Sequence, residues 1–115
     1  MMPRFCYTFE LLPGTIERYD REHAEIWPGV VDAMRAAGVI DYSLFRRGHL
    51  VIATGSCDRP VAEVFATLDA DAVNVQWSTH IRQLMHDPLD EEGNLLLAEE
   101  IWHLPLRGTN PHPLE

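Results

Sequence analysis

The spacing of apolar residues switches along this chain between the period of a strand and the period of a helix. In residues 4–11 apolar side chains alternate, with Phe5, Tyr7 and Phe9 on one face. Residues 15–37 instead repeat their apolar positions every three or four residues. A side-chain period of two is typical of a strand, and a period of about 3.6 is typical of a helix. This stretch therefore predicts a strand followed by a helical segment.

The rest of the chain also alternates between strand-like and helix-like segments. Two apolar runs, 40–45 and 50–57, flank Arg46-Arg47-Gly48-His49, where glycine suits the backbone of a hairpin turn. The later periods predict a helix over 61–68, a helix over 71–85, a polar connection over 87–94 and a last strand over 95–104. The resulting order is the α+β, ferredoxin-like βαββαβ sandwich, with an expected strand order of 4-1-3-2 in the sheet.

The first helical segment carries its own start, break and stop signals. Thr15 is a residue type that caps helix N-termini, and Gly38 is a typical C-terminal stop. Pro28 lacks an N–H and clashes with the preceding turn, so it favours a break near Trp27. We expect Pro28 to occupy the first position of a second helical piece.

Length and charge limit the functions that the chain can have. The 115 residues fit one domain, expected over 1–105, with a loose tail over 106–115. The net charge of −9 argues against nucleic acid or anionic membrane as a partner. No apolar run approaches the roughly 18 residues of a membrane span, and the opening residues lack a signal-peptide core. We expect a cytoplasmic protein with a small neutral substrate.

The cysteine, histidine and glycine patterns predict no metal and no cofactor. Cys6 and Cys57 lack a CxxC spacing, and we expect two small reduced core residues near matching ends of neighbouring strands. His80 and His86 are six positions apart, which does not place two ligands on one helical face. The glycines form no phosphate-binding loop, and GxSxG is absent.

Three aromatic residues stand four positions apart in the first helical segment. Tyr19, His23 and Trp27 are expected on one helical face, where they present a phenol, an imidazole and an indole in a row. Aromatic faces bind the C–H surfaces of sugars, and histidine is the simplest proton shuttle near neutral pH. The row therefore predicts a sugar site, although a histidine on a half-apolar helix face is often only a boundary residue.

The same stretch resembles the signature of the L-rhamnose mutarotase family. The resemblance is carried by Tyr19, His23 and the run Ile26-Trp27-Pro28. It continues over roughly residues 4–105 at further positions: Gly38, Asp41-Tyr42-Ser43, the Trp77 segment and Leu97 to Pro105. The resemblance implies an enzyme with His23 as general acid/base, Tyr19 and Tyr42 in substrate-binding positions, and Trp77 against the sugar.

Two positions depart from the family pattern. Members that act on rhamnose typically have a second tryptophan after the first, whereas this chain has Ser78. They tend to carry tyrosine where this chain has His80. The resemblance therefore leaves the identity of the sugar open, with Ser78 as a substrate-binding position. His80 is a candidate second proton-transfer group, or else an exposed helix histidine.

Together these patterns predict a cofactor-independent aldose mutarotase for a 6-deoxy-hexopyranose such as L-rhamnose or L-fucose. Alternatives are a cofactor-free monooxygenase, a haem-degrading enzyme of the same fold, and a non-catalytic sugar-binding module. The run Leu50-Val51-Ile52-Ala53 is apolar on both faces, which is more than one helical layer needs. A second copy covering the open face would explain it, and the resemblance likewise implies a homodimer of the dimeric α/β-barrel type.

Overall fold

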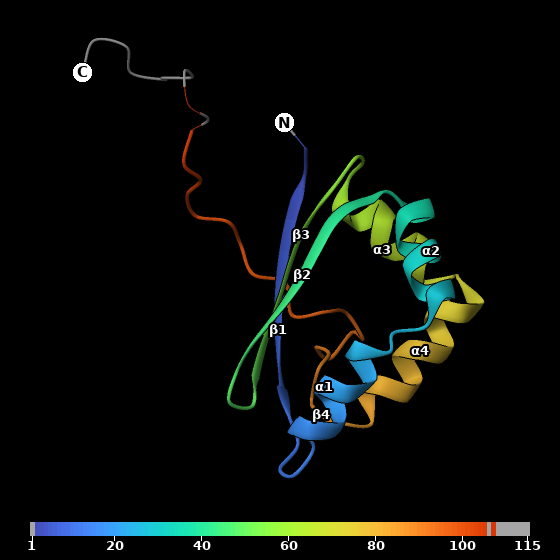
Figure 1. Ribbon diagram of the computed structural model, residues 1–115. Helices are drawn as coiled ribbons and strands as arrows, with labels where there is room; N and C mark the ends of the chain where they lie inside the picture. The colour runs from blue at the N-terminus through green and yellow to red at the C-terminus, as the bar shows by residue number, and fades with distance from the viewer. Residues whose placement is uncertain (1, 106, 108–115) are drawn as a thin grey trace.

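The computed structural model describes residues 2–105 and 107. In this part of the chain, one four-stranded sheet carries four helices (Figure 1). The elements follow one another as β1 (Arg4–Leu11), α1 (Ile16–Ala24), α2 (Pro28–Ala37), β2 (Val39–Arg47), β3 (Leu50–Cys57), α3 (Val61–Asp69), α4 (Ala72–Arg82) and β4 (Met85–His86). The tail predicted over 106–115 lies outside the described residues, apart from Arg107.

The sheet has the strand order β2-β3-β1-β4, with every neighbouring pair antiparallel. Read from its other edge, this is the predicted order 4-1-3-2, so the ferredoxin-like α+β fold is confirmed. The helices lie on one side of the sheet, and the outer face of β2 and β3 carries no helix (Figure 1). A functional site between sheet and helices is therefore enclosed by elements from both halves of the chain.

The fourth strand is not where the sequence predicted it. β4 consists of Met85 and His86, which pair with the end of β1, and residues 95–104 form no ladder. The chain turns away from the sheet directly after β4, because Asp87 has a positive φ of 41° and Pro88 has no N–H to donate.

Residues 95–98 nevertheless return to the same edge of β1. Leu97 forms an isolated antiparallel bridge with Tyr7, and the Ala98 N–H donates to the Cys6 carbonyl at 2.7 Å. The edge of β1 is thus shared between a short strand and a later extended segment. The predicted place of this segment beside β1 is confirmed for residues 97 and 98, and the prediction of a continuous strand over 95–104 is wrong.

The break between α1 and α2 is confirmed. α1 ends at Ala24, and α2 begins with Pro28 at its first turn and ends at Gly38, whose φ of 109° is left-handed. Thr15 occupies the N-cap of α1, but its hydroxyl does not cap the helix. It donates instead to the carbonyl of Leu12 at 2.8 Å, so it fixes the turn between β1 and α1.

The core lies between the sheet and the helices. Alternate residues of the two central strands face the helices and are buried, among them Phe5 and Phe9 of β1 and Val51 and Ala53 of β3. Val30 of α2 is fully buried against this surface. The alternation predicted for residues 4–11 therefore orients β1 correctly.

The two cysteines lie on opposite faces of the sheet. Cys57 is fully buried on the helix side, in a cluster with Phe5 and Val64. Cys6 pairs in register with Thr54 and points the other way, because it alternates with Phe5. Both thiols are free. The prediction of small reduced core residues holds for Cys57, whereas Cys6 is only half-buried.

The inner face of α4 includes a polar side chain. Asn74, Trp77 and Ile81 are buried, whereas Val75 is 43% exposed. The buried amide is not left unpaired, because Asn74 Nδ2 donates to the Leu68 carbonyl at 3.2 Å. The helix also ends at residue 82 and not near 85, because the chain enters β4.

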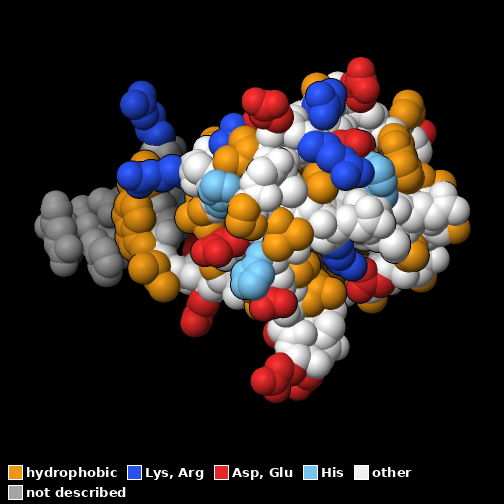
Figure 2. Space-filling view, turned by 90° about the horizontal axis from the view of Figure 1, so that it is seen from below, with side chains coloured by type: hydrophobic (Ala, Val, Ile, Leu, Met, Phe, Trp, Pro, Cys, Tyr) orange, Lys and Arg blue, Asp and Glu red, His pale blue; other side chains and the backbone are white. Residues whose placement is uncertain are grey.

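The surface of the described part mixes residue types. Figure 2 shows one end of the molecule, where acidic and basic side chains lie interspersed with apolar ones. Within residues 2–105 and 107, no helix is both long enough and apolar enough to span a bilayer.

Candidate active site

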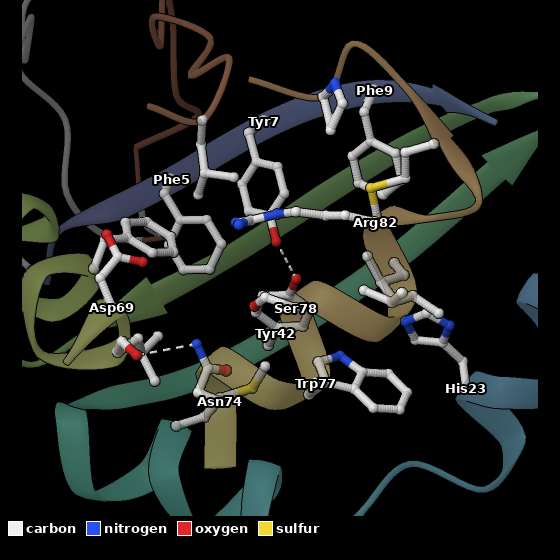
Figure 3. A pocket seen from close by; sticks show the side chains of 18 of the residues that line it. Phe5, Tyr7, Phe9, His23, Tyr42, Asp69, Asn74, Trp77, Ser78 and Arg82 are labelled. Carbon is white, nitrogen blue, oxygen red and sulfur yellow. Dashed lines mark hydrogen bonds between the residues drawn. The ribbon is translucent and has the colours of Figure 1, made fainter. Parts of the chain in front are cut away.

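A cavity of about 90 Å³ lies between the helix-facing side of the sheet and helices α1 and α4 (Figure 3). Its walls are mostly aromatic and aliphatic, with a few polar groups among them, which is the usual composition of a small-molecule site. Five of the six side chains selected from the sequence line it: Tyr19, His23, Tyr42, Trp77 and Ser78.

His23 stands at one end of the row of cavity residues in Figure 3. Its Nδ1 lies 3.0 Å from the main-chain carbonyl oxygen of Tyr19, one helical turn earlier. A carbonyl oxygen can only accept, so Nδ1 carries the hydrogen and the neutral ring keeps its lone pair on Nε2. Burial lowers the pKa of His23, against the opposing effects of that hydrogen bond and of Asp20. The imidazole is therefore favoured in its neutral form.

Aromatic rings fix the His23 ring on two sides. The Tyr19 ring centroid lies 4.3 Å from it, and Trp77 meets it nearly edge-on at 5.4 Å. Tyr19 is only 4% exposed and also packs against Phe9. Burial raises the pKa of Tyr19, so its hydroxyl stays protonated and can donate.

Tyr42 enters the cavity from β2, and its hydroxyl forms a hydrogen bond with that of Tyr7. Burial raises the pKa of both phenols, and the charge of Arg82 acts in the opposite direction on Tyr7. The sequence reasoning did not select Tyr7. Its alternation with Phe5 and Phe9 already placed it on the inner face, but only the assembled sheet, in which β3 separates β1 from β2, shows that its hydroxyl meets that of Tyr42.

Strand β2 begins with an irregularity. A register shift between Val39 and Asp41 inserts an extra residue in β2, which leaves Ile40 55% exposed. Tyr42 still faces the helices, because the regular pairing resumes beyond the bulge with Leu44 on the same side.

Trp77 and Ser78 are neighbours on α4. Trp77 is 5% exposed and packs nearly perpendicular to Trp27, with 5.2 Å between the ring centroids. Trp27 itself stands at the N-cap of α2 and does not line the cavity. The predicted row of three rings on one helix is therefore wrong at its third member, because α1 ends at Ala24.

His80 lies outside the cavity. Its Nε2 is 3.0 Å from a Glu22 carboxylate oxygen, and its ring stacks on Trp27 with a centroid distance of 5.8 Å. The ring centroid is 6.2 Å from that of Trp77, which does line the cavity. The structure therefore groups His80 with Glu22, and not with His23.

Three polar cavity residues were missed by the sequence reasoning: Asp69, Asn74 and Arg82. Asn74 and Arg82 lie one turn before and one turn after Ser78 on α4, so helical spacing alone could have linked the three. In the described part of the chain, no three His, Cys, Asp or Glu side chains come close enough together to hold a metal ion.

Comparison with known proteins gives related sequences and folds. Residues 4–104 match the family described as L-rhamnose mutarotase. The L-rhamnose mutarotase of Jannaschia sp. is 29% identical over 104 residues, covering 90% of this chain and 100% of the relative. That of Paraburkholderia phytofirmans is 31% identical over 106 residues, covering 90% and 96%.

Two solved structures share the fold. An L-rhamnose mutarotase from Formosa agariphila superposes with a TM-score of 0.71 at 17% identity, covering 90% of this chain and 99% of that one. Tetracenomycin F2 cyclase from Streptomyces glaucescens gives 0.68 at 16% identity, covering 90% and 97%. One fold thus serves different chemistries, so the assignment depends on the sequence match. Because that match spans nearly all of the described residues, the chain belongs to the L-rhamnose mutarotase family of isomerases.

Proposed function

We propose that this protein is a cofactor-independent mutarotase that interconverts the α and β anomers of a 6-deoxy-hexopyranose of the L-rhamnose or L-fucose kind. The observation that carries the proposal is the hydrogen bond from His23 Nδ1 to the Tyr19 carbonyl. It leaves Nε2 as the free acceptor of a ring that lines an aromatic cavity. A base of this kind is what removal of an anomeric hydroxyl proton requires.

The proposed reaction opens and recloses the sugar ring. His23 Nε2 takes the proton of the anomeric hydroxyl as the bond between the anomeric carbon and the ring oxygen breaks, and the protonated imidazole then gives that proton to the ring oxygen. The open aldehyde rotates, and the reverse steps close the other anomer. The protonated phenols of Tyr19 and Tyr42 are the hydrogen-bond donors that line the cavity beside His23.

The cavity walls suit an uncharged ring. Trp77 and Phe9 present aromatic surface, and the phenols supply hydroxyls that can bond to those of a sugar. The cytoplasm is the proposed location, since the free thiols of Cys6 and Cys57 suit a reducing compartment.

The test is anomer exchange measured by NMR saturation transfer on L-rhamnose, L-fucose, D-ribose and D-galactose. We expect selective acceleration of a 6-deoxy sugar. His23→Asn keeps polarity and similar bulk but cannot shuttle protons, so exchange should slow by roughly 10²–10⁴. His49→Asn, the same substitution in the exposed β2–β3 turn, is the matched control.

The outcomes separate the competing hypotheses. A folded His23→Asn protein as fast as wild type would remove this histidine from the mechanism, and His80→Asn would then be measured in the same way. Saturation transfer to a bound sugar without faster exchange would indicate a sugar-binding module. Oxygen consumption or haem binding would indicate one of the oxidative activities that this fold also supports.

A further inference from the structure

A groove of about 950 Å³ lies outside the cavity, between the outer side of α3 and α4 and residues 89–97. The groove and the cavity have six lining residues in common: Phe65, Asp69, Asn74, Ser78, Arg82 and Leu95. The groove adds further polar side chains, including Thr79, Asp90 and Asn94. The two spaces therefore meet along one wall, to which both α3 and α4 contribute.

Ser78 is the smallest side chain on that shared wall. It is half-buried, and it lines both the cavity and the groove. An indole at this position would fill space that the serine leaves between the two. The site is thus wide where Ser78 stands, at a distance from the aromatic end that holds His23 (Figure 3).

Arg82 places a positive charge at this junction. It is half-buried, and among the described residues no carboxylate lies within 4.0 Å of its guanidinium, whereas Arg4, Arg46 and Arg59 each pair with an acidic side chain. Apart from the neutral His23, it is the one basic side chain among the described residues that line the cavity. In Figure 3 its side chain extends across the cavity toward Tyr7.

We propose that the cavity and the groove form one site for a reducing sugar that bears an anionic group, with Arg82 as the residue that binds the anion. The sugar's anomeric carbon lies at His23, and the anionic group lies beside Ser78 and Arg82. A guanidinium binds carboxylate, sulfate ester and phosphate ester groups through paired N–H donors. This inference rests on the proposed mutarotase function and extends its substrate class from neutral to anionic sugars.

The negative charge of Asp69 should weaken the binding of an anionic group at this junction. Its carboxylate lines the same junction, but it is exposed, so solvent and salt screen its charge more than that of half-buried Arg82. The attraction to Arg82 is therefore expected to dominate. Removing the charge with Asp69→Asn should tighten the binding of an anionic sugar.

The experiment compares L-rhamnose and L-fucose with hexuronates, hexose 6-sulfates and hexose 6-phosphates in the same NMR exchange assay. Among the last three, the sugar whose anomers exchange fastest identifies the chemical class of the anionic group. For wild type we expect faster exchange of at least one anionic sugar, with a KM that rises with salt concentration. Arg82→Gln should raise KM for that sugar at least tenfold more than it raises KM for a neutral sugar, and Arg82→Lys should restore part of the difference.

Two results would overturn the proposal: exchange of no anionic sugar by wild type, or equal losses on neutral and anionic sugars in folded Arg82→Gln. Chemical-shift titration with the preferred sugar checks binding if turnover is slow. If wild type accelerates neutral 6-deoxy sugars alone, the anion site is refuted and the proposed function stands. If it accelerates anionic sugars alone, the anion site stands and the 6-deoxy-sugar assignment fails.

Discussion

At the scale of single residues, the protonation of His23 is set by its own helix. The carbonyl of Tyr19 accepts from Nδ1 because residues one turn apart lie on the same helical face. The neighbouring rings of Tyr19 and Trp77 remove water from the imidazole, and this burial lowers its pKa. The helix therefore orients the ring, and the packing keeps it neutral.

The pH profile of exchange should show this effect. Because the folded-state pKa of His23 is lowered from its ordinary 6.5, the neutral base persists below that pH. We expect the acid limb of kcat/KM to have its midpoint below pH 6.5, with exchange lost as pH falls through it. Asp20→Asn removes a charge that raises this pKa, so it should move the midpoint further down. An acid limb above pH 6.5 would contradict the assignment.

The size of the side chain at Ser78 should affect which sugar the site prefers. Ser78→Trp restores the second ring of the family pattern and fills the space between cavity and groove. We expect the ratio of kcat/KM values to shift toward L-rhamnose by about 1–3 kcal/mol, the usual effect of one altered pocket contact. The sugar panel measures this ratio, and Gln76→Trp is the control, because Gln76 is an exposed residue of α4 that lines neither the cavity nor the groove. An unchanged ranking in a folded variant would remove Ser78 from the site.

At the scale of elements, β3 approaches β2 and β1 closely at Gly55. Gly55 pairs with Phe5 on one side and Tyr42 on the other. A β-carbon at this position would overlap the Phe5 ring and the Asp41 carbonyl oxygen. The absence of a side chain therefore lets Phe5 cover β3 and lets β2 keep its register beyond its bulge.

Gly55→Ala should accordingly destabilise the fold. Overpacking of this kind costs about 1–3 kcal/mol. We expect a lower urea midpoint with an unchanged m-value, measured by circular dichroism. Gly29→Ala in α2 is the control, because its β-carbon would meet only the side chain of Val73, which is 40% exposed. A Gly55→Ala protein as stable as wild type would show that Phe5 can move aside at little cost.

At the scale of the whole molecule, the sheet has one covered face and one open face. The open face carries Phe45, which is 59% exposed, together with half-buried Ile52 and Cys6. Beyond the sheet, Ile101 and Trp102 are 94% and 71% exposed. Apolar surface of this kind marks association sites more often than solvent-facing ones. A second copy, related by a two-fold axis, would cover the same surface on both molecules.

We therefore expect a homodimer at micromolar concentration, measured by light scattering. Phe45→Asp places a charge on the open face, at edge strand β2, and should shift the protein toward monomer. Val75→Asp changes another exposed apolar residue, on α4, and should leave the mass unchanged. A wild-type monomer, or a Phe45→Asp variant that remains dimeric, would contradict this interface.

The sequence by itself determined the features that depend on near neighbours. The alternation in β1, the restart of the helix at Pro28 and the helix stop at Gly38 follow from local backbone chemistry. The spacing of Tyr19 and His23 placed two cavity residues on one helix face, and the signature around them led to the family. The ferredoxin-like arrangement followed because the predicted order of strands and helices along the chain admits few other arrangements.

Only the tertiary structure decided which distant residues meet. The hydrogen bond between Tyr7 and Tyr42, the isolation of His80 and the place of Arg82 between cavity and groove depend on strand register and helix rotation. The last strand was misplaced for the same reason, since its pairing is with β1, at the other end of the chain. The periodicity of a segment indicates which face of its helix or strand is apolar. Which distant residues contact that face depends on the packing of the whole core, which no single segment of sequence specifies.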